Sequence, residues 1–323
     1  MSFLTTYFVH ARAVHAAAAA AGLVAVTQNE NFALRLEGGE QSAVWPAKFV
    51  VSVAGRLAYS ATFGRSTVGF AGWMPYAARQ WPIALDKAAF KRFAADNGIA
   101  TPAACVDPSQ IQGPFIIKKG DSSFGEGMRG PFLRDDRDDP DQALGEGEFY
   151  ENFIVGLIAK AWCWNGECFA IHLHRPSLVV GDGTSSVREL VTALPNARGG
   201  ENDWGLIARL AAYCGVSSLD SVVPHGKEVL IEYRYGSRYE PFAMQNENVL
   251  GQIRHSDLGF QFQRAATVLA DGISAHTGDR RAVYTLDAMV DGEGTACFLE
   301  MNCNPLVHPD LYGGMVEGLA TRR

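Results

Sequence analysis

A lysine followed by a loop of small residues is the feature of this sequence that points most directly to chemistry. Lys118 ends the apolar run 114–118, and the segment 119–127 that follows contains three Gly and two Ser. A backbone without bulky side chains can turn its N–H groups toward phosphate oxygens, and the lysine adds a positive charge. A flexible surface hairpin with a solvated lysine would have the same pattern, so both interpretations stand on these residues alone.

The loop also contains the glycine pattern GxGxxG at 125–130. In a dinucleotide-binding unit this pattern opens a helix, whereas here Pro131 and the two residues after it continue as a strand. In a protein kinase the lysine lies downstream of the pattern, and HRD and DFG motifs follow, which this chain lacks. We therefore interpret the loop as a flap between two strands.

Two carboxylates and an amide near the end of the chain form a second candidate site. Segments 282–290 and 295–301 predict the two strands of a hairpin, and Asp287, Glu300 and Asn302 lie on or beside them. Oxygen ligands of this kind suit Mg²⁺, and a bound cation would offset the repulsion between the two acids. A solvent-facing polar stripe is the alternative.

The register of this hairpin decides whether the three side chains meet. Pairing Val290 with Thr295 across the turn puts Asp287 opposite Phe298, with Glu300 and the amide on the same face. A shift by one residue would separate them. With the lysine and its glycine-rich loop, a magnesium site here would be typical of phosphoryl chemistry.

Several motifs occur in the order found in the ATP-grasp superfamily. They are Asp86-Lys87 with Lys91, and segments 115–118, 122–127, 150–156, 174–176 with 179–190, and 300–305. Over about residues 83–312 the chain resembles this superfamily, and within it the ligase region of cyanophycin synthetases and of bifunctional glutamate–cysteine ligase/glutathione synthetases. The resemblance implies an α+β fold in which two ATP-grasp subdomains grip ATP, preceded by a small α/β domain. The implied domains are 1–82, 83–153 and 154–323.

The resemblance also implies roles for individual residues. Lys87 and Lys118 match the phosphate-binding lysines, and Arg234 matches an arginine that faces the reacting phosphate, so Arg234 and Lys118 are the catalytic candidates. The expected metal ligands are Asp287, Glu300 and Asn302. The other nucleotide-binding candidates are the flap residues Ser122, Ser123, Phe124, Gly125 and Gly127, the adenine-reading hinge Glu151, Asn152, Phe153 and Ile154, and Lys160 in place of a ribose-binding arginine.

The activity that the resemblance implies is ADP-forming ligation of a carboxylate to an amine. ATP and Mg²⁺, or Mn²⁺ in its place, would convert the carboxylate to an acylphosphate, which the amine then displaces. The expected partners are small amino acid or peptide substrates. A non-catalytic, regulatory ATP-binding protein and an ATP-grasp kinase are the alternatives.

Three departures from the relatives lie near the expected acyl and amine sites. The chain has 158–160 (Ile-Ala-Lys) in place of an acid–aromatic–arginine run, and 235–238 in place of an Asn-rich segment. Thr285 stands where many ligases of the D-alanine type carry an arginine. These changes leave the identity of the acid and the amine open.

Composition excludes some other classes of function. With 28 Lys and Arg against 35 Asp and Glu, the net charge of −7 offers no basic footprint for nucleic acid or an anionic membrane. No apolar run reaches the ~18–20 residues of a membrane span. The six cysteines are scattered without a CxxC pair, which indicates reduced thiols and a cytoplasmic protein. A homodimer is the default for this family.

Local patterns predict most of the elements. The start of the chain reads as a buried strand and an Ala-rich helix ending at Gly22. A helix capped by Asp86 and a hairpin turning at 165–166 follow. Further expected elements are a capping box at 186–189, helices over 203–214 and 257–276, and a strand over 229–233.

Three histidines are candidate ligands of a metal or a substrate. His172 and His174 share a strand face, for which a packed or hydrogen-bonded role is favoured over a metal pair. His308 lies close in sequence to the metal strand and is a candidate for substrate contact, with a plain surface residue as the alternative.

Overall fold

Helix α2 (Lys87–Asp96) shows how a local signal positions part of the site. The Asp86 side chain accepts a hydrogen bond from the Ala88 N–H, and Asn97 ends the helix, as predicted. Phe90 and Ala94, four residues apart, are buried against the core, so the helix presents a fixed face to its surroundings.

The computed structural model describes residues 3–54, 56–76, 80–120, 127–133, 142–195, 200–234, 239 and 247–320. It is an α+β structure whose strands pair in an antiparallel manner, so the predicted α+β class is confirmed. The flap candidates Ser122, Ser123, Phe124 and Gly125 lie outside the described residues, as does the departure at 235–238. Among the described residues, no helix is both long and apolar enough to cross a membrane.

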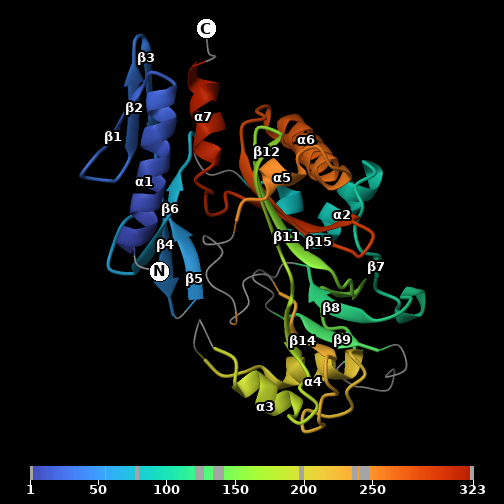
Figure 1. Ribbon diagram of the computed structural model, residues 1–323. Helices are drawn as coiled ribbons and strands as arrows, with labels where there is room; N and C mark the ends of the chain where they lie inside the picture. Colours follow the sequence, from blue (N-terminus) through green and yellow to red (C-terminus); the bar gives the residue numbers. More distant parts are fainter. Residues whose placement is uncertain are drawn as a thin grey trace.

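The central sheet has the strand order β12-β11-β15-β16. Its strands are β11 (Leu157–Trp164), β12 (Glu167–His174), β15 (Val283–Val290) and β16 (Ala296–Cys303). The predicted hairpin between β11 and β12 is confirmed, with Asn165 and Gly166 at φ of 54° and 90° in its two-residue turn. Two antiparallel hairpins side by side thus form this sheet (Figure 1).

One face of the central sheet is apolar and packs on α6 (Asp257–Thr277), with α5 (Leu250–Ile253) beside it. Tyr284, Leu286 and Ala288 of β15 point to this side and are buried. The opposite face is divided. Trp162 and Trp164 make one end apolar, whereas charged side chains occupy its middle.

The N-terminal unit covers the apolar end of that divided face. It consists of α1 (Phe3–Ala20) and two three-stranded sheets, and the last helix, α7 (Leu311–Ala320), lies beside α1 (Figure 1). The strands are β1 (Val24–Thr27), β2 (Leu34–Gly38), β3 (Gln41–Trp45), β4 (Ala47–Val53), β5 (Arg56–Ser60) and β6 (Thr67–Trp73). The predicted Ala-rich helix that ends near Gly22 is confirmed. The strand predicted before it is wrong, because α1 already begins at Phe3.

A smaller sheet, here called the flap sheet, has the order β7-β10-β8-β9. Its strands are β7 (Ala104–Cys105), β8 (Phe115–Lys119), β9 (Arg129–Phe132) and β10 (Glu148–Asn152). The ribbon pair β13 (Ser177–Val180) and β14 (Glu228–Glu232), with α3 (Val187–Thr192) and α4 (Trp204–Tyr213), completes this end. The capping box at Ser186 and the helix ending before Gly215 are as predicted. Short 3-10 helices occur at η1 (Pro82–Ala84) and η2 (Pro108–Gln110).

Helix α4 and strand β14 pack on the flap sheet, although they lie far along the chain. Leu210 of α4 and Tyr233 share a cluster with Ile116 and Phe153. The predicted domain boundaries at 82/83 and 153/154 stay predictions.

Candidate active site

A buried carboxylate between two ammonium groups forms the first of two charged centres. Glu151 of β10 is 1% exposed, and its oxygens lie 2.5 Å from Lys118 Nζ and 2.6 Å from Lys91 Nζ. Lys118 reaches it from the neighbouring strand β8, and Lys91 from α2. We call this group the Glu151 centre.

The Glu151 centre is held in its charged form. Burial alone would raise the pKa of Glu151, but the positive charges of Lys118 and Lys91 outweigh it and hold that pKa below its usual value. Burial lowers the pKa of Lys91, against the opposing effect of Glu151. One negative charge faces two positive ones here, so the centre carries an excess positive charge that suits an anion.

Two acids and an amide form the second centre, on the divided face of the central sheet. Asp287 pairs directly with Glu300 across β15 and β16. Asn302 Nδ2 lies 3.1 Å from an Asp287 oxygen and 3.4 Å from a Glu300 oxygen. The structure therefore brings together the three predicted metal ligands, which we call the acid centre.

The predicted register of this hairpin is wrong, although the predicted grouping forms. Val290 pairs with Ala296 rather than Thr295, which by alternation alone would turn Glu300 toward the α6 side. The pairing then shifts between Asp287 and Ala288, with Leu299 as the extra residue of a bulge. The two one-residue shifts add up to two residues, a full period of the strand, so Glu300 lies on the face of Asp287.

Two lysines form ion pairs with the carboxylates of the acid centre. Lys160, directly opposite Asp287 on β11, places its Nζ 2.5 Å from an Asp287 oxygen. Lys87 of α2 lies 3.3 Å from Glu300. Burial and the neighbouring Glu300 raise the pKa of Asp287, while Lys160 opposes that rise. Lys160 was expected at the ribose, and here it contacts the acids.

The donor set of the acid centre fits a hard divalent cation. Among the described residues, no group of three or more His, Cys, Asp or Glu side chains is placed to hold a metal. The candidate consists instead of two carboxylates and an amide, which presents an oxygen once it turns over. Carboxylate and amide oxygens are ligands of Mg²⁺ and Mn²⁺.

Helix α2 joins the two centres. Lys87 and Lys91 are four residues apart and so lie on one helix face, from which the first contacts Glu300 and the second Glu151. The sequence motif contained Lys91, but reasoning from sequence gave it no role in the site. Its spacing from Lys87 was the signal that could have placed it there.

The hinge residues after Glu151 lie where the flap sheet meets α4. Asn152 carries a buried side-chain oxygen with no hydrogen-bond partner among the described residues. Phe153 is buried against Tyr213 and Tyr233, with ring centroids 5.2 and 5.0 Å away, and Ile154 is half-buried. Their adenine-reading role stays a prediction.

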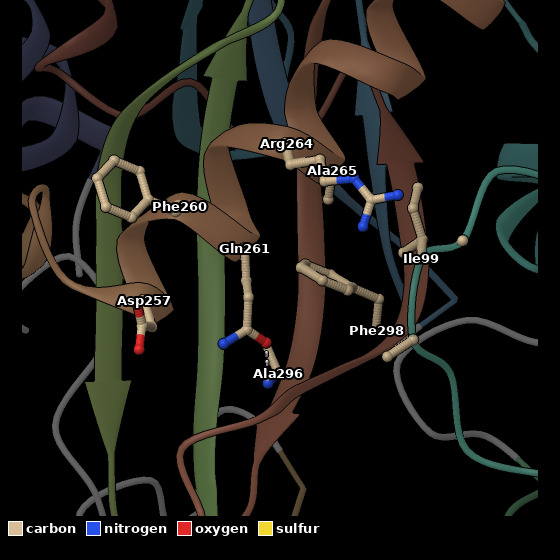
Figure 2. A pocket seen from close by; sticks show the side chains of 10 residues that line it. Ile99, Asp257, Phe260, Gln261, Arg264, Ala265, Ala296 and Phe298 are labelled. Atoms are coloured by element: carbon tan, nitrogen blue, oxygen red, sulfur yellow. Dashed lines mark hydrogen bonds between the residues drawn. The ribbon is translucent and has the colours of Figure 1, made fainter.

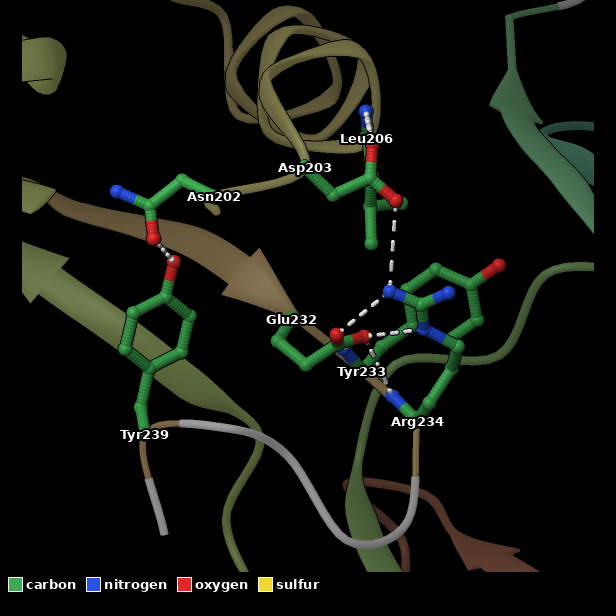
Figure 3. Close-up of polar contacts among 7 residues, drawn as sticks. All are labelled: Asn202, Asp203, Leu206, Glu232, Tyr233, Arg234 and Tyr239. Carbon is green, nitrogen blue, oxygen red and sulfur yellow. Dashed lines mark hydrogen bonds and ion pairs between the residues drawn. The ribbon is translucent and has the colours of Figure 1, made fainter. Parts of the chain in front are cut away.

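Arg234 lies apart from both centres. Its guanidinium makes a two-point ion pair with Glu232, at 2.8 and 2.7 Å, and a longer one of 3.6 Å with Asp203 at the start of α4 (Figure 3). Within the described residues, it contacts neither Glu151 nor Asp287. Gly127, after the flap, has a φ of 74°.

A cavity of about 340 Å³ lies on the opposite side of the central sheet from the acid centre. Phe298 and Ile99 line it, with Arg264 and Phe260 of α6 at its edge (Figure 2). Because Phe298 points toward the α6 core, this cavity is separate from the two charged centres.

Comparisons with known proteins find similar structures only at low sequence identity. No family model and no curated protein sequence matches the chain. A bifunctional glutathione synthetase from Pasteurella multocida is similar to it at 16% identity and a TM-score of 0.41, over 91% of this chain and 40% of that one. A D-alanine–D-alanine ligase from Bacillus anthracis has 12% identity and a TM-score of 0.37, over 74% and 68%.

A third structure, the D-cycloserine synthetase DcsG, has 14% identity and a TM-score of 0.39, over 74% of this chain and 70% of that one. The chain thus spans less than half of the glutathione synthetase. Any function for it must stand on its own side chains. The similar structures also include the ATP-grasp ligase PsnB, at 9% identity and a TM-score of 0.37, over 73% of this chain and 58% of that one.

Proposed function

We propose that the protein is an ATP- and Mg²⁺-dependent ligase that joins a small carboxylate, such as an amino acid or peptide, to an amine. ATP would phosphorylate the carboxylate, and the amine would displace phosphate from the resulting acylphosphate. The products are an amide, ADP and phosphate.

The observation that carries this proposal is the bridge made by α2 between a positive and an acidic centre. Lys91 reaches the Glu151 centre and Lys87 the acid centre from the same helix face. Phosphoryl transfer requires an anion site next to a cation site, because catalysis there consists mainly of positioning and charge neutralisation. The two centres supply both in one place.

The chain's own residues divide the work. Lys118 and Lys91 would hold phosphate oxygens through their excess positive charge. Asp287, Glu300 and Asn302 would hold the cation, which supplies Lewis-acid neutralisation of the phosphates when bound. Lys87 and Lys160, released from their carboxylates, would then turn toward the transferring phosphate and the substrate.

The test is release of ADP and phosphate from MgATP with amino acids and dipeptides, supplied singly and in pairs, with mass spectrometry of the products. ADP release that depends on an amine, with a product lighter by one water than its two substrates, supports the ligase. ADP release without an amine, with a stable phosphorylated product, supports a kinase instead. Nucleotide binding without turnover for any pair supports the non-catalytic alternative.

A matched pair of variants locates the activity. Lys118→Met should abolish ADP formation, because it removes a phosphate-binding charge from the Glu151 centre. Lys119→Met changes the next residue of β8, which is exposed, and should leave turnover near that of the unmodified protein. Full turnover by Lys118→Met would exclude this site as the nucleotide site.

A further inference from the structure

A row of ionisable side chains crosses the divided face of the central sheet. Lys160 pairs with Asp287 on one side and with His172 on the other, and Glu300 continues the row beyond Asp287. The proposed function uses the acid end of this row. His172, at the opposite end, has no role in it.

The hydrogen bonds around His172 fix its protonation. The backbone N–H of Asp310 donates to His308 Nδ1 at 3.3 Å, so that nitrogen carries no proton. His308 then holds its proton on Nε2 and donates it to His172 Nε2 at 3.2 Å. His172 must therefore carry its own proton on Nδ1.

The pKa of each ring lies below the usual value for histidine, which favours the neutral form of both. Burial, with the nearby His308, His174 and Lys160 charges, lowers the pKa of His172 to about 4, while Asp310 opposes this shift. Burial likewise lowers the pKa of His308. His172 is also fixed in place, because its ring lies 4.6 Å from Trp162 and 5.0 Å from His308, measured between centroids.

The proton on His172 Nδ1 points to a missing acceptor. His172 is 0% exposed, and its Nδ1 has no hydrogen-bond partner among the described residues. Buried donors without acceptors are costly, and such groups persist where a ligand supplies the acceptor.

We propose that His172 Nδ1 binds the carboxylate that this protein activates, beside Lys160, its direct cross-strand neighbour. The proposal rests on the proposed function and names its acid subsite. A neutral N–H donor beside an ammonium group selects an anionic oxygen, and the ammonium group would repel a protonated amine. Lys160 and His174 are only half-buried, so solvent reaches this face next to His172.

The first test needs no turnover. Histidine labelled with ¹⁵N reports in two-bond NMR spectra which ring nitrogen carries the proton. We expect the Nδ1–H form for His172, and a shift of that resonance on titration with acetate but not with acetamide, its uncharged counterpart. An Nε2–H form overturns the proposal. So does a resonance that acetate leaves unmoved, which would mean that a buried water is the acceptor.

The second test separates this subsite from the nucleotide site. His172→Phe removes the donor, and the KM of the acid substrate should rise about 10- to 100-fold, with the Kd of a fluorescent ATP analogue unchanged. His172→Asn restores an N–H near the Nδ1 position and should recover part of the loss. His174→Phe, on the same strand face, is the matched control and should change that KM less than threefold.

The outcomes distinguish the two proposals. An equal rise in KM for His174→Phe, or none for His172→Phe, overturns the subsite while ligation itself stands. A protein that shows the acetate response and yet releases no ADP with any acid and amine loses the proposed function, while the carboxylate site stands.

Discussion

The two charged centres contain the same kinds of side chain in different proportions. At the Glu151 centre one carboxylate meets two ammonium groups, and at the acid centre two carboxylates meet two ammonium groups. The first carboxylate is almost fully buried, with its pKa lowered, whereas the pKa of Asp287 is raised. The two centres therefore differ in the ratio of carboxylates to ammonium groups and in how deeply their carboxylates are buried.

This contrast shows which centre is complete without a ligand. The charge of Glu151 is balanced by the protein itself, through ion pairs with Lys91 and Lys118. The two carboxylates of the acid centre repel each other, and lysines offset only part of that repulsion. The first centre is therefore a built-in scaffold for an anion, and the second is a site that a cation would complete.

The largest expected effect is on stability. Glu151→Gln leaves two buried ammonium groups without their counter-charge and should lower the free energy of unfolding by about 3–5 kcal/mol, measured by urea denaturation. Glu148→Gln, in the same strand, removes a more exposed ion pair with Arg129 and should cost about 1 kcal/mol or less. Equal losses would mean that the Glu151 centre is no scaffold.

The second prediction concerns how stability depends on pH, because the pKa of Glu151 is lowered and that of Asp287 is raised. The lowered pKa of Glu151 adds stability above its unfolded value of 4.5, and this is lost as pH falls. The raised pKa of Asp287 adds stability below its unfolded value of 3.8, and this is lost as pH rises through its folded pKa. Each slope is at most ~1.4 kcal/mol per pH unit.

Urea denaturation of Glu151→Gln and Asp287→Asn between pH 3 and 7, roughly the range that brackets both unfolded pKa values, checks these signs. The deficit of Glu151→Gln should shrink toward acid. The stability of Asp287→Asn relative to the unmodified protein should be greatest at neutral pH. Parallel pH dependence of the two variants would erase the distinction between the centres.

The third prediction concerns cation affinity. Lys160→Met removes the ammonium group that competes for Asp287, so Mn²⁺ should bind about fivefold to tenfold more tightly without nucleotide, measured by electron paramagnetic resonance. Lys91→Met, at the other centre, should leave Mn²⁺ affinity unchanged. Weaker Mn²⁺ binding by Lys160→Met would show that the lysine does not occupy the cation's place.

The smallest expected effect tests the helix shared by both centres. Asp86→Ala removes the N-cap of α2 and should cost about 1 kcal/mol of stability, lowering the melting temperature by a few degrees. Asp96→Ala, at the far end of the helix, should stay within about 0.5 kcal/mol. If loss of the Asp86 cap weakened only one of the two charged centres, α2 would not couple the two centres.

Helix caps and turns that depend only on neighbouring residues could be predicted from the sequence. The cap at Asp86, the Asn165-Gly166 turn and the capping box at Ser186 each specify a structure within a few residues. The acid centre was found for a similar reason, because the side chains that suit a cation are few and closely spaced. Lys91 and the His172 to His308 contact depend on elements far apart in the chain and were missed.

Two failures have identifiable physical causes. The bulge at Leu299 arises because Phe298 and Ala288 pack under α6 while Glu300 must face the other way, a conflict that exists only in the assembled sheet. The start of the chain was misread because half of the residues that α1 buries are polar. The buried residues are Thr6, His10, Val14 and Ala18, spaced four apart, and the first two of them are polar.

The last helix has a consequence for how the chain acquires its structure. Leu311, Met315 and Val316 of α7 are part of the core of the N-terminal unit. The Tyr312 hydroxyl and His10 Nδ1 share a hydrogen bond of 2.9 Å, across 302 positions of sequence. The N-terminal unit therefore lacks part of its core until α7 has been made. We expect this unit to mature late, because its core closes over the 302 positions that separate His10 from Tyr312.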